Sequence, residues 1–105
     1  MLNFQNVKNF LNFTGKKADL FSIALYNNYA PPPGFCFDIV CTDDPIIDDP
    51  KSPDYNLDKK IELFKKYVGY QSDSYRTNNI ILTMGEDFNY QNAEMFFSNM
   101  DKLIK

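Results

Sequence analysis

Histidine is absent from this sequence of 105 residues. A Ser-His-Asp or Cys-His catalytic unit and an imidazole-ligated zinc site are therefore excluded within the chain, because each needs a ring nitrogen as base or ligand. Basic residues are also in the minority, with 11 Lys and Arg against 14 Asp and Glu and a net charge of −3. This acidic balance argues against a nucleic-acid partner, which usually meets a basic surface.

Long apolar runs are missing as well. No run approaches the roughly 20 residues needed to cross a bilayer, so the sequence predicts no membrane-spanning segment. The N-terminus lacks the basic start and apolar stretch of a signal peptide, which indicates either a cytosolic protein or a missing true start. What the chain does contain is 44% hydrophobic residues, including ten Phe and seven Tyr, and this is enough to build a folded core.

Two cysteines and one sequon bear on the cellular compartment. Cys36 and Cys41 either close a short disulfide loop in an oxidising compartment or remain two reduced thiols in a core. A two-cysteine metal site is the weakest interpretation, because no histidine completes it. Their spacing leaves the first two possibilities open. Asn12 begins an Asn-Phe-Thr glycosylation sequon, which favours the secretory pathway.

Hydrophobic periodicity predicts helices that alternate with strands. The expected elements are a helix over 2–13, a buried strand over 19–26, a Pro-rich loop over 27–53, a helix over 57–68, a strand over 79–84 and a helix over 91–104. Asn56 is expected to cap the second helix through its side chain. Alternation of this kind predicts an α/β fold with a parallel sheet and helical crossovers.

Glu86 and Asp87 lie where the second predicted strand ends and the last helix begins. Proteins of the α/β class place their active-site groups at this edge. Adjacent side chains point in different directions, so at most one of the two carboxylates is expected to enter a cleft. From the spacing alone, helix capping is the favoured interpretation of both. Phe88 and Tyr90 suit either stacking on a sugar or packing in a core.

Five stretches in order resemble the lysosomal members of glycoside hydrolase family 38, which are α-mannosidases. They are residues 29–41, 44–46, 75–78, 83–93 and 99–104, and among them are Tyr29-Ala30-Pro31-Pro32-Pro33-Gly34-Phe35-Cys36-Phe37-Asp38 and Gly85-Glu86-Asp87-Phe88. The resemblance covers most of the chain from about Asp19 onward. It implies that residues 1–105 are an internal fragment of the family's N-terminal β/α-barrel catalytic domain, with parallel strands alternating with helices and a long disulfide-tied loop.

The resemblance implies a retaining α-mannosidase that hydrolyses α-linked mannose from N-glycans of glycoproteins. Asp87 falls on the general acid/base position of the Gly-x-Asp-Phe motif, and Tyr29 matches a tyrosine that lines the sugar subsite. Tyr26 lies close enough in the sequence to compete for that match. As the acid, Asp87 would need a raised pKa and would stand about 5 Å across the sugar from the nucleophile. Zinc is implied for the full-length parent and not for this chain alone, because its ligands, like the nucleophile, belong to other segments.

The same resemblance assigns Cys36 and Cys41 to the short disulfide of the lysosomal members. It implies a lysosomal or secretory-pathway protein, although no signal peptide is present in this chain. The expected partners are a mannose-containing oligosaccharide and the remainder of the parent mannosidase, and the isolated chain is expected to be inactive. The alternative is a non-catalytic fragment or truncated product that folds or binds carbohydrate only with the rest of the barrel.

Overall fold

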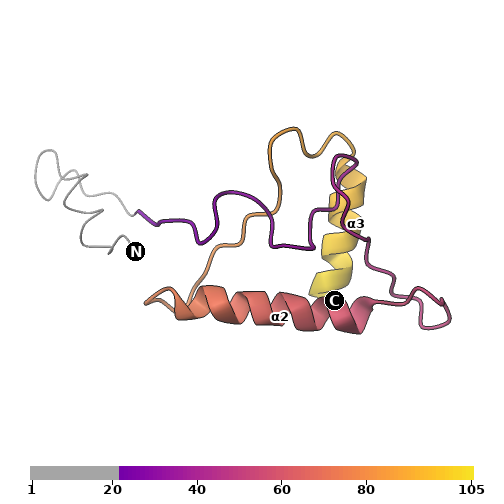
Figure 1. The fold of residues 1–105 in the computed structure, drawn as a ribbon, viewed down its shortest axis with the longest axis horizontal. Helices are drawn as coiled ribbons and strands as arrows, with labels where there is room; N and C mark the ends of the chain where they lie inside the picture. The colour runs from indigo at the N-terminus through magenta and orange to yellow at the C-terminus, as the bar shows by residue number, and fades with distance from the viewer. Residues whose placement is uncertain (1–21) are drawn as a thin grey trace, which may run out of the picture.

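The computed structural model describes residues 22–105, in which extended segments and loops connect two helices (Figure 1). Helix α2 spans Leu57–Asp73 and helix α3 spans Ala93–Ile104. In Figure 1, α2 runs along the length of this part of the chain and α3 stands across it. Within residues 22–105, no helix is both long enough and apolar enough to cross a membrane. The helix predicted over 2–13 and the glycosylation sequon at Asn12 lie outside the described residues.

Helix α2 begins where the sequence predicts, but Asn56 acts differently from the prediction. The main-chain oxygen of Asn56 accepts the N–H of Lys60 across 3.0 Å, as the first helical bond requires. Its side chain makes no capping bond. Instead, Asn56 Oδ1 accepts the N–H of Ile47 at 2.8 Å, and Nδ2 donates to the oxygen of Pro45 at 2.9 Å. Asn56 therefore fastens the preceding loop to the start of α2.

Helix α3 presents one apolar face to the interior. Phe96 is fully buried on this face, and Asn99 is buried beside it. Asn99 Oδ1 accepts the N–H of Ile46 at 2.6 Å, and its Nδ2 donates to the oxygen of Met95 at 2.7 Å. With Glu94 in the first turn, the helix also carries a negative charge where the helix dipole favours one.

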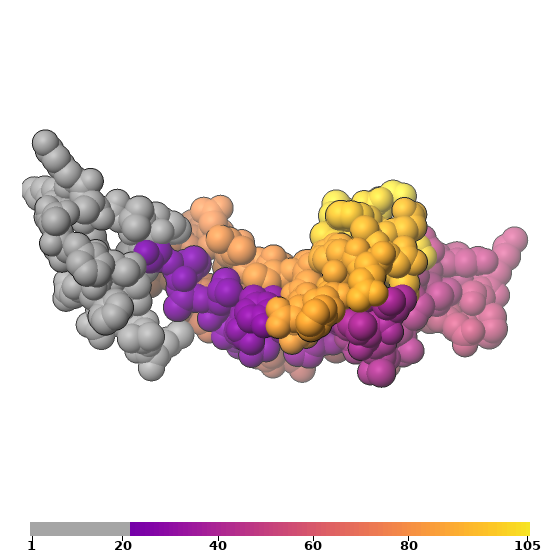
Figure 2. Space-filling view, turned by 90° about the horizontal axis from the view of Figure 1, so that it is seen from above, coloured from indigo at the N-terminus to yellow at the C-terminus, as the bar shows by residue number. Residues whose placement is uncertain are grey.

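The long Pro-rich loop supplies most of the core. The four buried hydrophobic side chains of the core are Phe35, Phe37, Ile46 and Phe96. The rings of Phe35 and Phe37 meet edge to face with centroids 6.1 Å apart, and Phe37 meets Phe96 in the same way at the same separation. In Figure 2 the orange and yellow atoms of the C-terminal third accordingly lie against the purple and magenta atoms of this loop. The loop is ordered because it buries aromatic surface against α3.

The predicted α/β fold, a partial β/α barrel with parallel strands, is wrong for the described residues. Residues 22–105 contain no strand, and only an isolated bridge joins Asn27 and Tyr29. The apolar run over 79–84 is extended, but side chains rather than a backbone ladder hold it. Gln71 Nε2 donates to the oxygen of Ile81 at 2.6 Å, and the hydroxyl of Thr83 donates to the oxygen of Ala30 at 2.9 Å.

The physical reason for this correction is the lack of backbone pairing. An apolar run forms a strand only when a second segment satisfies its main-chain N–H and C=O groups in register. Leu25, near the end of the first run, and Ile81, at the centre of the second, are 43% and 54% exposed. Within residues 22–105 these runs are therefore extended segments with uncovered apolar side chains, and apolar content alone could not distinguish them from strands.

Candidate functional site

Glu86 and Asp87 lie on a tight turn between the extended segment over 79–84 and α3. The N–H of Asn89 donates to the oxygen of Glu86 at 3.1 Å and closes this turn. Both carboxylates are exposed. The N-cap residue of α3 is Asn92, so neither Glu86 nor Asp87 occupies the capping position, and the capping interpretation is wrong.

The turn has a strained main chain that is anchored by Tyr90. Phe88 and Tyr90 adopt φ angles of 64° and 66°, which are uncommon for bulky side chains. Gly85 has φ 148°, and a Cβ atom there would lie 2.7 Å from Cε2 of Tyr90, so only glycine fits. The Tyr90 hydroxyl donates to the oxygen of Met84, and its ring stacks on Phe96 with centroids 4.5 Å apart. Tyr90 thus closes the turn over the core.

Phe88 points away from this packing. Its side chain is 81% exposed, whereas Tyr90 is 37% exposed. The two roles that the sequence left open for these aromatics are therefore divided between them. Tyr90 packs on the core, and Phe88 is free to meet a ligand or another surface.

Tyr29 interacts with Asp87. The pKa of the Tyr29 hydroxyl is raised above its usual value of 10.0, first by a hydrogen bond to Asp87, then by the negative charge of Asp87, with smaller contributions from burial and from the charge of Glu86. A tyrosinate next to a carboxylate is unfavourable, so the nearby Asp87 favours the protonated form of the Tyr29 phenol. The structure therefore brings together the two residues to which the resemblance assigns the acid/base role and the sugar contact.

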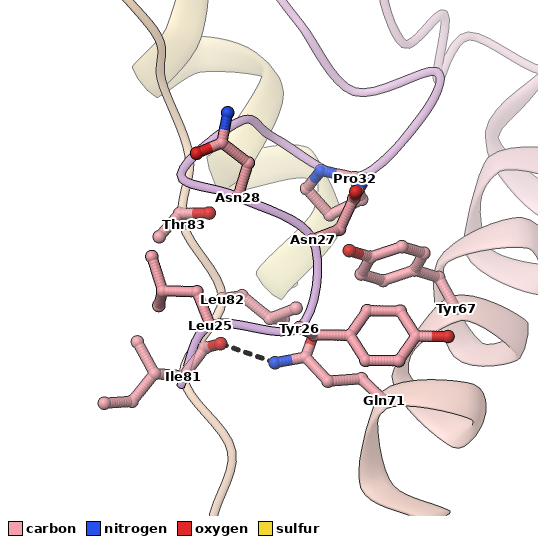
Figure 3. A pocket seen from close by; sticks show the side chains of 10 residues that line it. All are labelled: Leu25, Tyr26, Asn27, Asn28, Pro32, Tyr67, Gln71, Ile81, Leu82 and Thr83. Atoms are coloured by element: carbon pink, nitrogen blue, oxygen red, sulfur yellow. Dashed lines mark hydrogen bonds between the residues drawn. The ribbon is translucent and has the colours of Figure 1, made fainter. Parts of the chain in front are cut away.

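Tyr26 lies in a different environment. Its ring meets that of Tyr67 edge to face at 5.7 Å, and both line a small cavity in which Gln71 bonds to Ile81 (Figure 3). The cavity measures about 10 Å³, which is room for one water molecule and far too little for a sugar. Of the two tyrosines, Tyr29 is the one beside Asp87.

A disulfide joins Cys36 to Cys41, as the resemblance implies, with the two Cα atoms 5.9 Å apart. Inside this loop, Asp38 is only 4% exposed. Its Oδ2 accepts the N–H of Tyr90 at 2.7 Å, and its Oδ1 accepts the N–H of Val40 at 3.3 Å. Asp38 therefore connects the disulfide loop to the turn that carries Asp87. The sequence reasoning assigned it no role, although a carboxylate enclosed between two cysteines was a visible signal.

The described residues do not fit a zinc site. Among residues 22–105, no group of three or more His, Cys, Asp and Glu side chains is arranged to hold a metal ion. The only two cysteines are joined to each other, and the sequence has no histidine.

Comparison with known proteins identifies the family. Residues 6–105 match the model of the glycosyl hydrolases family 38 N-terminal domain. The chain belongs to glycoside hydrolase family 38. Over 88 residues, or 84% of the chain, it is 50% identical to the lysosomal alpha-mannosidase of Cavia porcellus and 47% identical to that of Homo sapiens. Over 90 residues, or 86% of the chain, it is 39% identical to the alpha-mannosidase of Canavalia ensiformis.

This family 38 chain spans about 9% of the length of each of these relatives. The matched region includes both the disulfide loop and the turn that bears Asp87. The family assignment therefore covers every feature of the candidate site. It is independent of the strand predictions that the structure corrects.

Proposed function

We propose that this chain is a segment of the N-terminal catalytic domain of a retaining α-mannosidase, in which Asp87 is the general acid/base. The observation that carries the proposal is that Asp87 has the largest influence on the Tyr29 hydroxyl, although the two residues lie on separate loops far apart in the sequence. Family membership, with lysosomal alpha-mannosidases among the relatives, supports α-linked mannose of N-glycans as the substrate class. The same relatives and the disulfide support a lysosomal or secretory location.

In this role Asp87 acts twice. As a carboxylic acid it protonates the glycosidic oxygen as the bond to the leaving group breaks, and as a carboxylate it then takes a proton from the attacking water. Tyr29 is protonated at neutral and acidic pH, as any tyrosine is, so its hydroxyl can donate a hydrogen bond to the Asp87 carboxylate. A bond of this kind orients the Asp87 carboxylate for the step in which it takes a proton from water.

The other catalytic groups, namely the nucleophile and the zinc ion, are assigned to parts of the enzyme outside this segment. Retaining hydrolysis needs a second carboxylate about 5 Å from the acid/base, on the other side of the sugar. Glu86 does not meet this need, because it is the immediate neighbour of Asp87 and adjacent side chains diverge. We assign the nucleophile, and the zinc ion that the family resemblance implies, to the remainder of the enzyme. The 105-residue chain alone is therefore expected to be inactive.

A hybrid enzyme tests the proposal. The 88 matching residues of the Cavia porcellus lysosomal alpha-mannosidase are replaced by those of this chain. We expect the hybrid to hydrolyse an α-mannoside, and we expect Asp87→Asn to lower kcat by about 10²- to 10⁴-fold, the contribution typical of general acid/base catalysis. The matched control is Glu86→Gln, which removes the neighbouring charge and should retain most of the activity. A folded hybrid without activity, or an Asp87→Asn hybrid as active as its parent, contradicts the proposal.

A further inference from the structure

We propose that Asp38 is a positioning residue, which holds the main chain of the Glu86–Tyr90 turn in the conformation that presents Asp87 to Tyr29. This inference rests on the proposed acid/base role of Asp87. It adds a residue that touches neither substrate nor reacting atoms and acts through the backbone of another loop.

The hydrogen bonds of Asp38 are the first argument. Its side chain is 4% exposed, and each carboxylate oxygen accepts a main-chain N–H, one from Val40 and one from Tyr90. Hydrogen bonds to an ionised acceptor are stronger than neutral ones, and a buried acceptor that loses its donors carries a desolvation penalty. The short bond of 2.7 Å to Tyr90 is therefore costly to break.

The conformation of the turn is the second argument. Positive φ angles at Phe88 and Tyr90 are unfavourable for these residue types, so the surroundings must impose them. The Tyr90 ring is held by Phe96 and its hydroxyl by Met84, but its main-chain N–H is held by Asp38. This last contact acts directly on the strained backbone.

The disulfide loop gives Asp38 a fixed position, and this is the third argument. The Cys36–Cys41 bond closes the loop, and the N–H of Cys41 donates to the main-chain oxygen of Asp38 at 3.0 Å. Phe37, the residue before Asp38, is 2% exposed in the core. The buried Phe37 on one side of Asp38 and the Cys36–Cys41 disulfide on the other fix the position of the Asp38 carboxylate. The carboxylate then fixes the main chain of the Glu86–Tyr90 turn through its bond to Tyr90.

The first test measures the geometry without catalysis. In the 105-residue chain with ¹³C-labelled tyrosine, the pKa of Tyr29 reports whether Asp87 is beside it. We expect Asp38→Ala to return this pKa toward 10.0, although Asp38 makes no contact that raises it directly. Because Asp38→Ala risks unfolding, a second chain carries the α-hydroxy analogue of tyrosine at position 90. This backbone ester removes the N–H donor and keeps the Tyr90 side chain, and it should have the same effect.

Asp43 provides the matched control. Its Oδ2 accepts the N–H of Cys36 at 3.0 Å, so it supports the same disulfide loop without touching the turn. Asp43→Ala should leave the Tyr29 pKa raised. Three results would each overturn the inference. They are a Tyr29 pKa that is not raised in the parent chain, a Tyr29 pKa that stays raised in the chain with the ester at position 90, and a fall of the Tyr29 pKa in Asp43→Ala equal to that in Asp38→Ala.

The second test uses the hybrid enzyme. Asp38→Ala should lower kcat by about 10- to 100-fold with little change in KM, as expected when a catalytic group is misplaced rather than removed. Asp38→Asn, whose one oxygen can still accept the N–H of Tyr90, should recover most of that loss. If Asp87→Asn leaves activity intact, the proposed function fails while the Tyr29 measurement stands. If Asp87→Asn is inactive but Asp38→Ala matches Asp43→Ala, only the role of Asp38 fails.

Discussion

The ring of Tyr90 stacks on the ring of Phe96, with centroids 4.5 Å apart and planes inclined by 21°. Phe96 is fully buried and also meets Phe37 of the disulfide loop. Through Tyr90, the turn that carries Asp87 thus packs directly against the hydrophobic core. Stability of the core and geometry of the candidate site consequently depend on the same aromatic residue.

Replacement of Phe96 by alanine should therefore be strongly destabilising. We expect Phe96→Ala to lower the free energy of unfolding by about 3–5 kcal/mol, because it leaves a cavity among aromatic rings. Urea denaturation of the 105-residue chain measures this loss. Phe97→Ala is the control, since Phe97 is 55% exposed and should cost about 1 kcal/mol or less. Equal losses in the two variants would show that α3 does not pack as described.

Two glycines should respond oppositely to the same substitution. Gly85→Ala places a methyl group 2.7 Å from the Tyr90 ring at φ 148°, so we expect a loss of about 1–3 kcal/mol in the free energy of unfolding. Gly69→Ala introduces a methyl group within α2 with nothing inside 4 Å, and should gain about 0.5–1 kcal/mol from helix propensity. Denaturation of both variants checks this, and a neutral Gly85→Ala would contradict the anchoring of Tyr90 beneath the turn.

The raised pKa of Tyr29 predicts a pH dependence in the alkaline range. Between pH 10.0 and the raised pKa, the folded chain keeps a proton that the unfolded chain has lost, so the stability contributed by this contact falls as pH rises through that interval. Asp87→Asn should move the Tyr29 pKa back toward 10.0, so the pH interval over which this contribution is lost should become narrower. Titration by NMR of ¹³C-labelled tyrosine measures it. The pKa of Tyr55, raised by burial and by Asp58, should not move in this variant.

The ion pair of Asp48 with Lys102 predicts an acid dependence of opposite sign. The two groups lie 3.2 Å apart, and the hydrogen bond from Lys102 lowers the pKa of Asp48 below 3.8. The pair stabilises the fold above pH 3.8, and its contribution is lost as pH falls through the lowered pKa. Lys102→Met should return the Asp48 pKa toward 3.8, measured from its carboxyl ¹³C shift. Because both side chains are partly exposed, the accompanying change in stability should be small.

Helix positions followed from local sequence signals. The apolar spacing after Asn56 located the start of α2, and the face containing Phe96 located α3 to within two residues of its start. These signals are local, because an amphipathic helix satisfies its own backbone hydrogen bonds. A strand does not, so the apolar runs over 19–26 and 79–84 could not reveal whether a pairing segment lay beside them.

Parts of the candidate site were predictable for a different reason. Asp87, Tyr29 and the Cys36–Cys41 pair came from resemblance to a family. The structure confirms the disulfide and places Asp87 near Tyr29, whereas the roles of these two residues stay predictions. Asp38 was missed because its importance depends on a hydrogen bond to Tyr90, which lies far away in the sequence. Such a contact becomes visible only when the fold brings the two loops together.

The general acid role of Asp87 is tested most directly by leaving-group dependence in the hybrid enzyme. With an alkyl α-mannoside, whose leaving oxygen must be protonated, Asp87→Asn should lower the rate of glycosidic bond cleavage by about 10²- to 10⁴-fold. With a dinitrophenyl α-mannoside, whose leaving group needs no acid, bond cleavage measured in the pre-steady state should be almost unaffected. Equal losses with both substrates, or no loss with the alkyl mannoside, would contradict the assignment of Asp87 as the acid.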